Sequence, residues 1–159
     1  MIFNKLFLHN FLIISFIYIL DRVSKIYIIN LDKTNFGTEI IVSKYLNITL
    51  IWNKGISFGL LAFDKYGLYN LLSLLIFFII MVLIYMTIKN KGLKRFFFLM
   101  IIGGALGNLH DRIQFKAVPD FIDFHIGNFH WFIFNVSDIF ITTGVIGIII
   151  LELIKDKKT

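Results

Sequence analysis

Cysteine is absent from the 159-residue sequence, and proline occurs once. Without cysteine the chain has no disulfide bond, no thiolate metal ligand, no cysteine nucleophile and no cysteine on which it could itself be lipidated. Charged residues are scarce at 16%, against roughly 25% in soluble domains, whereas 58% of the residues are hydrophobic. One small core cannot bury this excess, so the composition argues against a soluble domain and indicates a membrane protein.

Basic residues outnumber acidic ones, which gives a formal net charge of +6. In a soluble protein such an excess would suggest a nucleic-acid partner. Here the basic residues lie beside apolar runs, which indicates membrane topology instead. We therefore expect no nucleic-acid binding. We also expect that residues 1–159 form a single integral-membrane domain.

Four apolar stretches predict four transmembrane helices, because a helix needs about 20 mostly apolar residues to cross the hydrocarbon layer. The first stretch is long for a cleaved signal peptide, and no small-residue cleavage site follows it. We expect the spans at about residues 6–29, 66–88, 96–112 and 131–154.

The positions of the basic residues predict how these spans are oriented. The connection between the second and third spans reads KNKGLKR, and lysines also flank the first and last spans. Loops rich in Lys and Arg stay in the cytoplasm. Both termini are therefore expected on the cytoplasmic side of the membrane, with the other two connections on the outer side.

The long first connection contains a β-branched and aromatic segment, IIVSKYLNITLIW, at residues 40–52. Its partial alternation predicts one or two short strands. A small sheet on the outer face, with Trp52 at headgroup depth, would suit this composition. The expected fold class is a mainly α membrane protein, with four transmembrane helices and a small β-sheet on the outer (periplasmic or extracellular) face.

Polar residues near the expected outer ends of the spans are candidates for a functional site. Asp21 and Lys25 are four residues apart on one helical face. They are either an ion pair at the membrane interface, with Lys25 extended toward water, or a brace for an active site. Asn53 and Gly55 are either part of an ordinary turn or a loop that presents Asn53 to a substrate.

The segment GGALGNLHDR combines small residues with polar ones. Gly103 and Gly107 are four residues apart, which permits close helix packing in lipid. Packing does not explain Asn108 and Asp111, which share a helix face. Arg112 is available to pair with Asp111 or with a lipid headgroup.

Two further segments, VPDFIDF and FNVSD, contain the remaining candidate acids. Asp120 and Asp123 have apolar and aromatic neighbours, so we expect burial to raise the pKa of these carboxyls. In the second segment, Asn135 or Ser137 as a helix N-cap, with Asp138 in the first turn, is a sufficient structural explanation.

Other catalytic chemistries lack their motifs in this sequence. There is no GxSxG nucleophile elbow and no phosphate loop, and the four histidines do not form an HExxH zinc motif. Carboxylate chemistry remains, in which two close carboxyls share a proton and activate water, as in aspartic proteases. A proton-coupled transporter or an assembly subunit is the alternative, but the acids lie at helix ends rather than in mid-span.

Five segments in order, DRVSK, NKGISFG, GGALGNLHDR, VPDFIDF and FNVSD, resemble the signature blocks of bacterial lipoprotein signal peptidase, or signal peptidase II. The resemblance covers nearly the whole chain. It implies that Asp120 and Asp138 are the catalytic pair. It also implies substrate-binding or supporting roles for Asp21, Lys25, Asn53, Gly55, Asn108, Asp111, Arg112 and Asn135.

The resemblance further implies an activity, partners and a mode of inhibition. This family removes the signal peptide from diacylglyceryl-modified prolipoproteins by cutting just before the lipidated cysteine. The expected partners are that substrate, membrane lipid and a globomycin-type inhibitor in the same cleft. No metal and no organic cofactor is implied, and the enzyme is expected to be a monomer whose site lies near the outer face.

A few positions depart from the family pattern. Pro119 replaces a frequent valine, Ser137 replaces a common alanine, and Ile139 replaces a small hydroxyl residue. The residues before FN also lack the usual proline. Asp123, which lies close to Asp120 in the sequence, is expected to have a supporting or solvent-facing role.

Overall fold

The computed structural model describes residues 2–35, 37, 39–55 and 65–156. Four helices and four strands follow one another in the order α1, β1, β2, α2, α3, β3, β4, α4. The helices are α1 (Ile2–Asn35), α2 (Lys65–Lys89), α3 (Gly92–Phe115) and α4 (Val136–Asp156). The strands are β1 (Ile40–Ser43), β2 (Leu46–Asn53), β3 (Val118–Ile126) and β4 (Phe129–Phe134).

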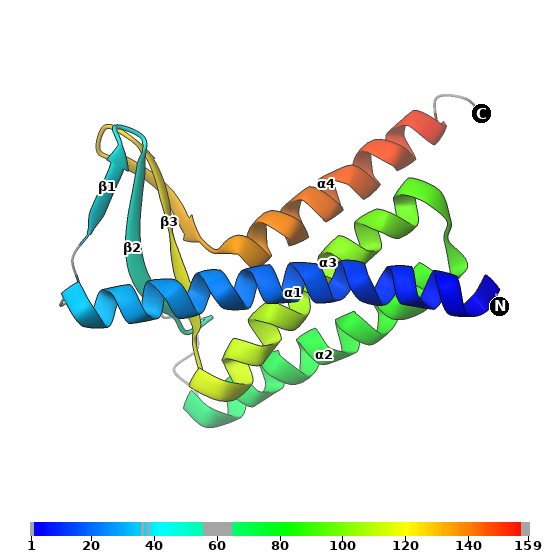
Figure 1. The fold of residues 1–159 in the computed structure, drawn as a ribbon, viewed down its shortest axis with the longest axis horizontal. Coiled ribbons are helices and arrows are strands. Elements are labelled where there is room, and N and C mark those ends of the chain that lie inside the picture. The colour runs from blue at the N-terminus through cyan, green and yellow to red at the C-terminus, as the bar shows by residue number, and fades with distance from the viewer. Residues whose placement is uncertain (1, 36, 38, 56–64, 157–159) are drawn as a thin grey trace.

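The molecule is elongated, and α1 runs along its whole length, past the sheet (Figure 1). The sheet lies at one end, whereas the beginning of α1, the α2–α3 turn and the end of α4 lie toward the other. The central helix is α3, which contacts α1, α2 and α4. Helix α3 therefore packs against each of the other three helices.

Small residues let the neighbouring helices approach α3 closely. A Cβ atom added at Gly103 would lie 2.9 Å from the side chain of Ile17 in α1. One added at Gly104 would lie 2.5 Å from the carbonyl oxygen of Ser137 in α4. The expectation that glycines here serve helix packing is confirmed.

Three helices in the described part of the chain are long and apolar enough to cross a membrane: Asn70–Lys89, Gly92–Phe115 and Val136–Lys155. The first and last of these leave most of their apolar side chains exposed, as contact with lipid would require. Helix α1 is not among the three, although it is the longest helix described.

The span expected at residues 131–154 is wrong at its start. Residues 129–134 form β4, and the helix begins only at Val136. The sequence FHWFIF is a short, almost unbroken apolar run, which periodicity alone cannot assign to a strand or a helix.

The four strands form one antiparallel sheet in the order β1-β2-β3-β4. The strands expected within residues 40–52 are confirmed as β1 and β2. The strand that contains Asp120, β3, was not predicted. Residues 118–121 are buried in succession and so show no alternation. Pairing of β2 with β3 brings Asn53 opposite Val118 and Ile51 opposite Asp120.

Candidate active site

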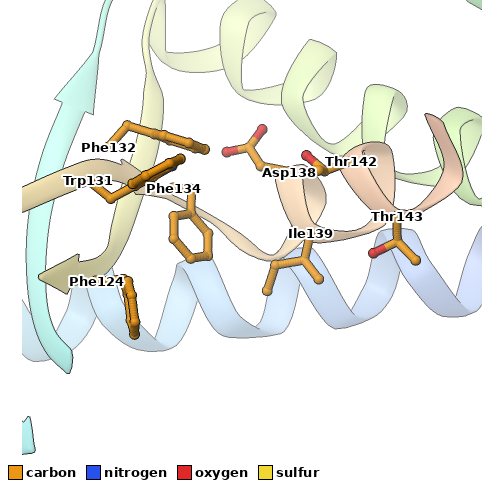
Figure 2. A pocket seen from close by; sticks show the side chains of 8 residues that line it. All are labelled: Phe124, Trp131, Phe132, Phe134, Asp138, Ile139, Thr142 and Thr143. Atoms are coloured by element: carbon orange, nitrogen blue, oxygen red, sulfur yellow. The ribbon is translucent and has the colours of Figure 1, made fainter. Parts of the chain in front are cut away.

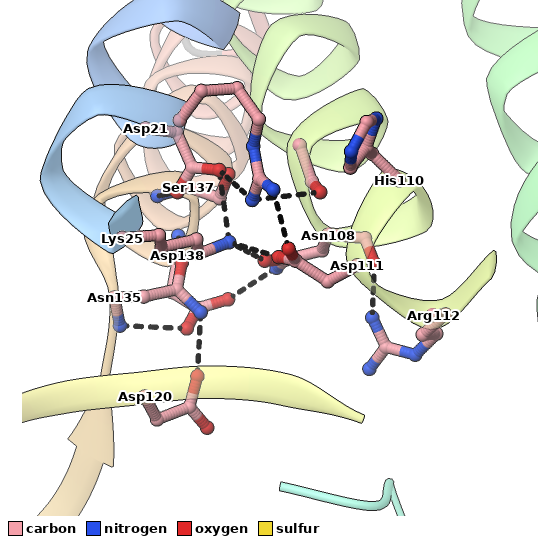
Figure 3. A network of polar contacts seen from close by, with 12 residues as sticks. Asp21, Lys25, Asn108, His110, Asp111, Arg112, Asp120, Asn135, Ser137 and Asp138 are labelled. Atoms are coloured by element: carbon pink, nitrogen blue, oxygen red, sulfur yellow. Dashed lines mark hydrogen bonds and ion pairs between the residues drawn. The ribbon is translucent and has the colours of Figure 1, made fainter. Parts of the chain in front are cut away.

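Lys25 lies at the centre of a buried cluster of charges (Figure 3). Its side chain is 0% exposed, and Nζ lies 2.9 Å from Asp21, 2.7 Å from Asp111 and 2.9 Å from the amide oxygen of Asn108. These contacts use all three N–H donors of the ammonium group. Lys25 therefore does not extend toward water, and its position agrees with the brace interpretation.

Arg22 completes the charge balance of this cluster. Its guanidinium group lies 3.0 Å from Asp21 and 2.6 Å from Asp111. Two acids and two bases thus neutralise each other in a region from which water is largely excluded. Sequence reasoning did not select Arg22, although it lies next to Asp21 within the DRVSK segment.

Asp21 also connects α1 to the start of α4. One of its oxygens accepts a 3.0 Å hydrogen bond from the backbone N–H of Ser137. A carboxylate is favoured at this position, because the first turn of a helix presents unpaired N–H groups. Gly107 permits the contact, since a Cβ there would lie 2.5 Å from Asp21 and 2.4 Å from the Ser137 hydroxyl.

Asp138 and Asn135 form a reciprocal cap at the N-terminus of α4. The backbone N–H of Asp138 donates to the side chain of Asn135, and the backbone N–H of Asn135 donates to Asp138, both over 3.1 Å. This is the capping-box arrangement, so the interpretation of Asn135 as an N-cap is confirmed. The other Asp138 oxygen accepts a 2.8 Å hydrogen bond from the amide of Asn108.

Asp120 is 3% exposed and accepts hydrogen bonds from two amides: 2.6 Å from Asn135 and 2.8 Å from Asn53. Burial raises the pKa of Asp120 above its ordinary value, and the negative charge of Asp138 adds to this. The two amides and the charge of Lys25 lower the pKa of Asp120, but by less. The expected effect of burial on Asp120 is confirmed.

Asn135 therefore contacts both acids of the expected pair, as Figure 3 shows. Its side-chain amide binds Asp120 and its backbone N–H binds Asp138. Through Asn108, Asp138 is joined in turn to the charged cluster around Lys25. A single network thus joins α1, α3, α4 and the sheet around the two carboxyls.

The remaining expected site residues lie around this network. Gly55 has a positive φ of 72°, and its N–H donates to the side chain of Asn53, in an Asx turn that orients that side chain. The rest of the NKGISFG segment, residues 56–59, lies outside the described residues. Arg112 does not pair with Asp111 but donates to the backbone oxygen of Asn108 over 3.2 Å.

Asp123 is separate from the two acids although it is close to Asp120 in sequence. Its carboxylate is bound by His130, with Nδ1 2.9 Å and 3.0 Å from the two oxygens. Asp123 is 4% exposed, so of its two expected roles the solvent-facing one is wrong, and the supporting one stays a prediction.

An apolar groove of about 460 Å³ lies beside Asp138 (Figure 2). Asp138 provides a carboxylate in its wall, and the two threonines of α4 supply hydroxyls. The other lining side chains are Phe124, Trp131, Phe132, Phe134 and Ile139.

The comparisons with known proteins identify the family of this chain. The family model described as signal peptidase (SPase) II matches residues 13–154. The lipoprotein signal peptidase of Pelagibacter ubique is 48% identical, over 98% of this chain and 97% of that protein. That of Anaplasma phagocytophilum is 46% identical, over 86% of each.

Solved structures give the same result for the fold. A bacterial membrane enzyme determined at 1.9 Å has a TM-score of 0.75 and 32% identity, over 91% of this chain and 92% of that chain. A second, determined at 2.3 Å, has a TM-score of 0.72 and 32% identity, over 94% and 89%. The resemblance noted in the sequence is thus confirmed along the chain, which belongs to the signal peptidase II family.

Proposed function

We propose that this chain is an aspartic endopeptidase that removes the signal peptide from diacylglyceryl-modified prolipoproteins, cutting just before the lipidated cysteine. The observation that carries the proposal is the arrangement around Asn135. Asp120 and Asp138 bind different groups of this one residue, beside an apolar groove. Family membership supports the same activity.

The environments of the two carboxyls suggest different roles. Asp138 accepts N–H groups from Asn108 and Asn135 at the start of α4, where a negative charge is favoured. Burial raises the pKa of Asp120, which favours its protonated form. We assign Asp138 as the base that takes a proton from water, and Asp120 as the acid that polarises the scissile carbonyl.

The reaction then follows the usual course for a carboxyl pair. Water loses a proton to Asp138, and its oxygen attacks the carbonyl carbon while Asp120 donates a hydrogen bond to the carbonyl oxygen. The tetrahedral intermediate collapses by breaking the C–N bond. The proton held by Asp138 goes to the departing amine of the lipidated cysteine, which leaves the site ready for another water molecule.

The groove beside Asp138 suits a substrate that is held in the membrane. Aromatic and aliphatic side chains line most of it, and Thr142 and Thr143 provide polar groups. Such a lining fits acyl chains and the apolar residues of a signal peptide. We place the globomycin-type inhibitor in this groove as well, and we expect the enzyme to act as a monomer.

We further propose that α1 is the fourth transmembrane helix and that the sheet lies on the outer face of the bacterial inner membrane. Lys91 lies in the α2–α3 turn, and Lys94 and Arg95 lie in the first turn of α3, at the end of the molecule remote from the sheet (Figure 1). Basic turns stay in the cytoplasm. The beginning of α1 and the end of α4 would then be cytoplasmic, and Asp120 and Asp138 would lie near the outer face.

The test is cleavage of a diacylglyceryl-modified prolipoprotein by the purified chain in liposomes. A matched substrate lacks only the diacylglyceryl group. We expect cleavage before the cysteine of the modified substrate and little cleavage of the other one. Equal cleavage of both would contradict the proposed specificity, and no cleavage of either by folded protein would contradict the proposed activity.

A further inference from the structure

Three potential metal ligands lie together on the β3–β4 hairpin, outside the site described above. They are Asp123 and His125 of β3 and His130 of β4. One donor atom from each residue lies within 4.8 Å of the others. Strand pairing explains this, because His125 and His130 are direct cross-strand partners and Asp123 is two residues from His125 on the same strand.

The distances within the cluster are close to those needed for one ion. Nδ1 of His130 lies 2.9 Å from Oδ2 of Asp123, and Nδ1 of His125 lies 3.9 Å from the same oxygen. Tetrahedral zinc, with bonds of about 2.1 Å, keeps its ligand atoms about 3.4 Å apart. These two separations lie on either side of that value, and all three donor atoms lie within 4.8 Å of one another, so side-chain rotations would have to bring the donors to tetrahedral spacing.

His125 provides a second observation. Its Nδ1 is buried and has no hydrogen-bond partner among the residues that the structure describes. A buried polar atom without a partner is costly and calls for an explanation, such as an ion. His125 also stacks on His130, with ring centroids 5.0 Å apart, so both imidazoles stand on the same side of the hairpin.

We propose that Asp123, His125 and His130 form a zinc site, with the fourth position left to water. Imidazole nitrogen suits zinc and other late transition metals, whereas Mg²⁺ and Ca²⁺ prefer oxygen ligands. His130 is 52% exposed at its side chain, so an ion can reach the cluster from outside.

The effect of such an ion would be structural. It would link β3, which carries Asp120, to β4, which leads directly into Asn135. Neither Asp120 nor Asp138 is a ligand, so no step of the peptidase reaction passes through the metal. A ligand that binds only the folded state stabilises it by mass action, and zinc should therefore raise the unfolding temperature.

The experiment measures zinc binding by calorimetry on the tag-free, full-length protein in detergent, after treatment with a chelator. We expect one zinc ion per chain, no comparable binding of Mg²⁺, and an affinity at least about tenfold lower in His130→Gln. His110→Gln is the matched control, because that histidine lies in α3 and contacts Tyr18 and Gln114. It should bind zinc as the wild type does.

His130→Gln is expected to fold because the side chain is more than half exposed. Thermal unfolding with and without zinc gives an independent reading. Zinc should raise the midpoint of the wild type and of His110→Gln, but not that of His130→Gln. The inference is overturned if the wild type binds no zinc saturably, or if His130→Gln binds it equally well, whatever the result of the cleavage assay.

Discussion

The side-chain amide of Asn135 donates a 2.6 Å hydrogen bond to the carboxyl of Asp120. Its backbone N–H binds Asp138 as part of the cap of α4. The residue that begins the helix is thus also the residue that fixes the two acids relative to each other. Asn135 therefore both caps α4 and positions Asp120, and a substitution can remove the second role while keeping the first.

Asn135→Ser should separate them. Serine is as good an N-cap as asparagine, but its hydroxyl is too short to replace the amide that reaches Asp120. We expect the rate of cleavage to fall at least about tenfold, which corresponds to an activation free energy higher by about 1.4 kcal/mol. Asn135→Ala should lose the same activity and, in addition, about 1 kcal/mol of stability from the cap. Cleavage rates and unfolding midpoints in detergent measure both effects, and full activity in Asn135→Ser would contradict this role.

Lys25→Met should be among the most destabilising single changes in the chain. It removes a buried positive charge, and among the described residues Arg22 is then the one cationic partner left to Asp21 and Asp111. Breaking a buried ion pair in this way costs about 3–5 kcal/mol. Lys33→Met, at an exposed position in the last turn of α1, is the control and should cost less than about 0.5 kcal/mol. Similar unfolding free energies for the two variants would show that the cluster does not brace the fold.

Ser137→Ala should be neutral or stabilising by up to about 1 kcal/mol. The hydroxyl is buried, and among the residues described it has no hydrogen-bond partner. The backbone N–H that binds Asp21 is unaffected by the change. Ser137→Val is the contrasting variant, because its extra bulk would press on the close approach to Gly107. A clear loss of stability in Ser137→Ala would mean that the hydroxyl has a partner.

The pH dependence of stability should reveal the raised pKa of Asp120. The folded protein holds the proton of the Asp120 carboxyl more tightly than the unfolded chain does. The resulting contribution to the free energy of unfolding is complete below the ordinary pKa of 3.8. It is lost as the pH rises from there through the raised pKa. The unfolding midpoint of the wild type, relative to that of Asp120→Asn, should therefore decrease as the pH rises above about 4. A difference that grows with pH would contradict the effect of burial.

Local composition was enough to predict some of the strands. It could not predict contacts that depend on how the strands pair. The alternation in residues 40–52 was enough to predict β1 and β2, whereas β3 was missed because its first residues are buried on both faces. The family resemblance supplied the pair Asp120 and Asp138, since no spacing in the sequence shows that they would approach the same asparagine.

Two features of the structure had only weak signals in the sequence. Arg22 is adjacent to Asp21, but nothing local indicates that it would reach Asp111 on another helix. The absence of an HExxH motif removed histidine ligands from consideration. His125 and His130 meet only because the hairpin pairs them across two strands, which a linear motif does not describe.

The most direct test of the central claim is the single-turnover rate of cleavage of a diacylglyceryl-modified prolipoprotein by three carboxyl-to-amide variants. Asp120→Asn and Asp138→Asn should fold, bind the substrate and cut it at least about 10³-fold more slowly than the wild type. Asp123→Asn, the matched change on the same strand, should retain most of its activity. Substantial cleavage by Asp120→Asn or Asp138→Asn, with the wild type active in the same liposomes, would show that these two residues are not the catalytic pair.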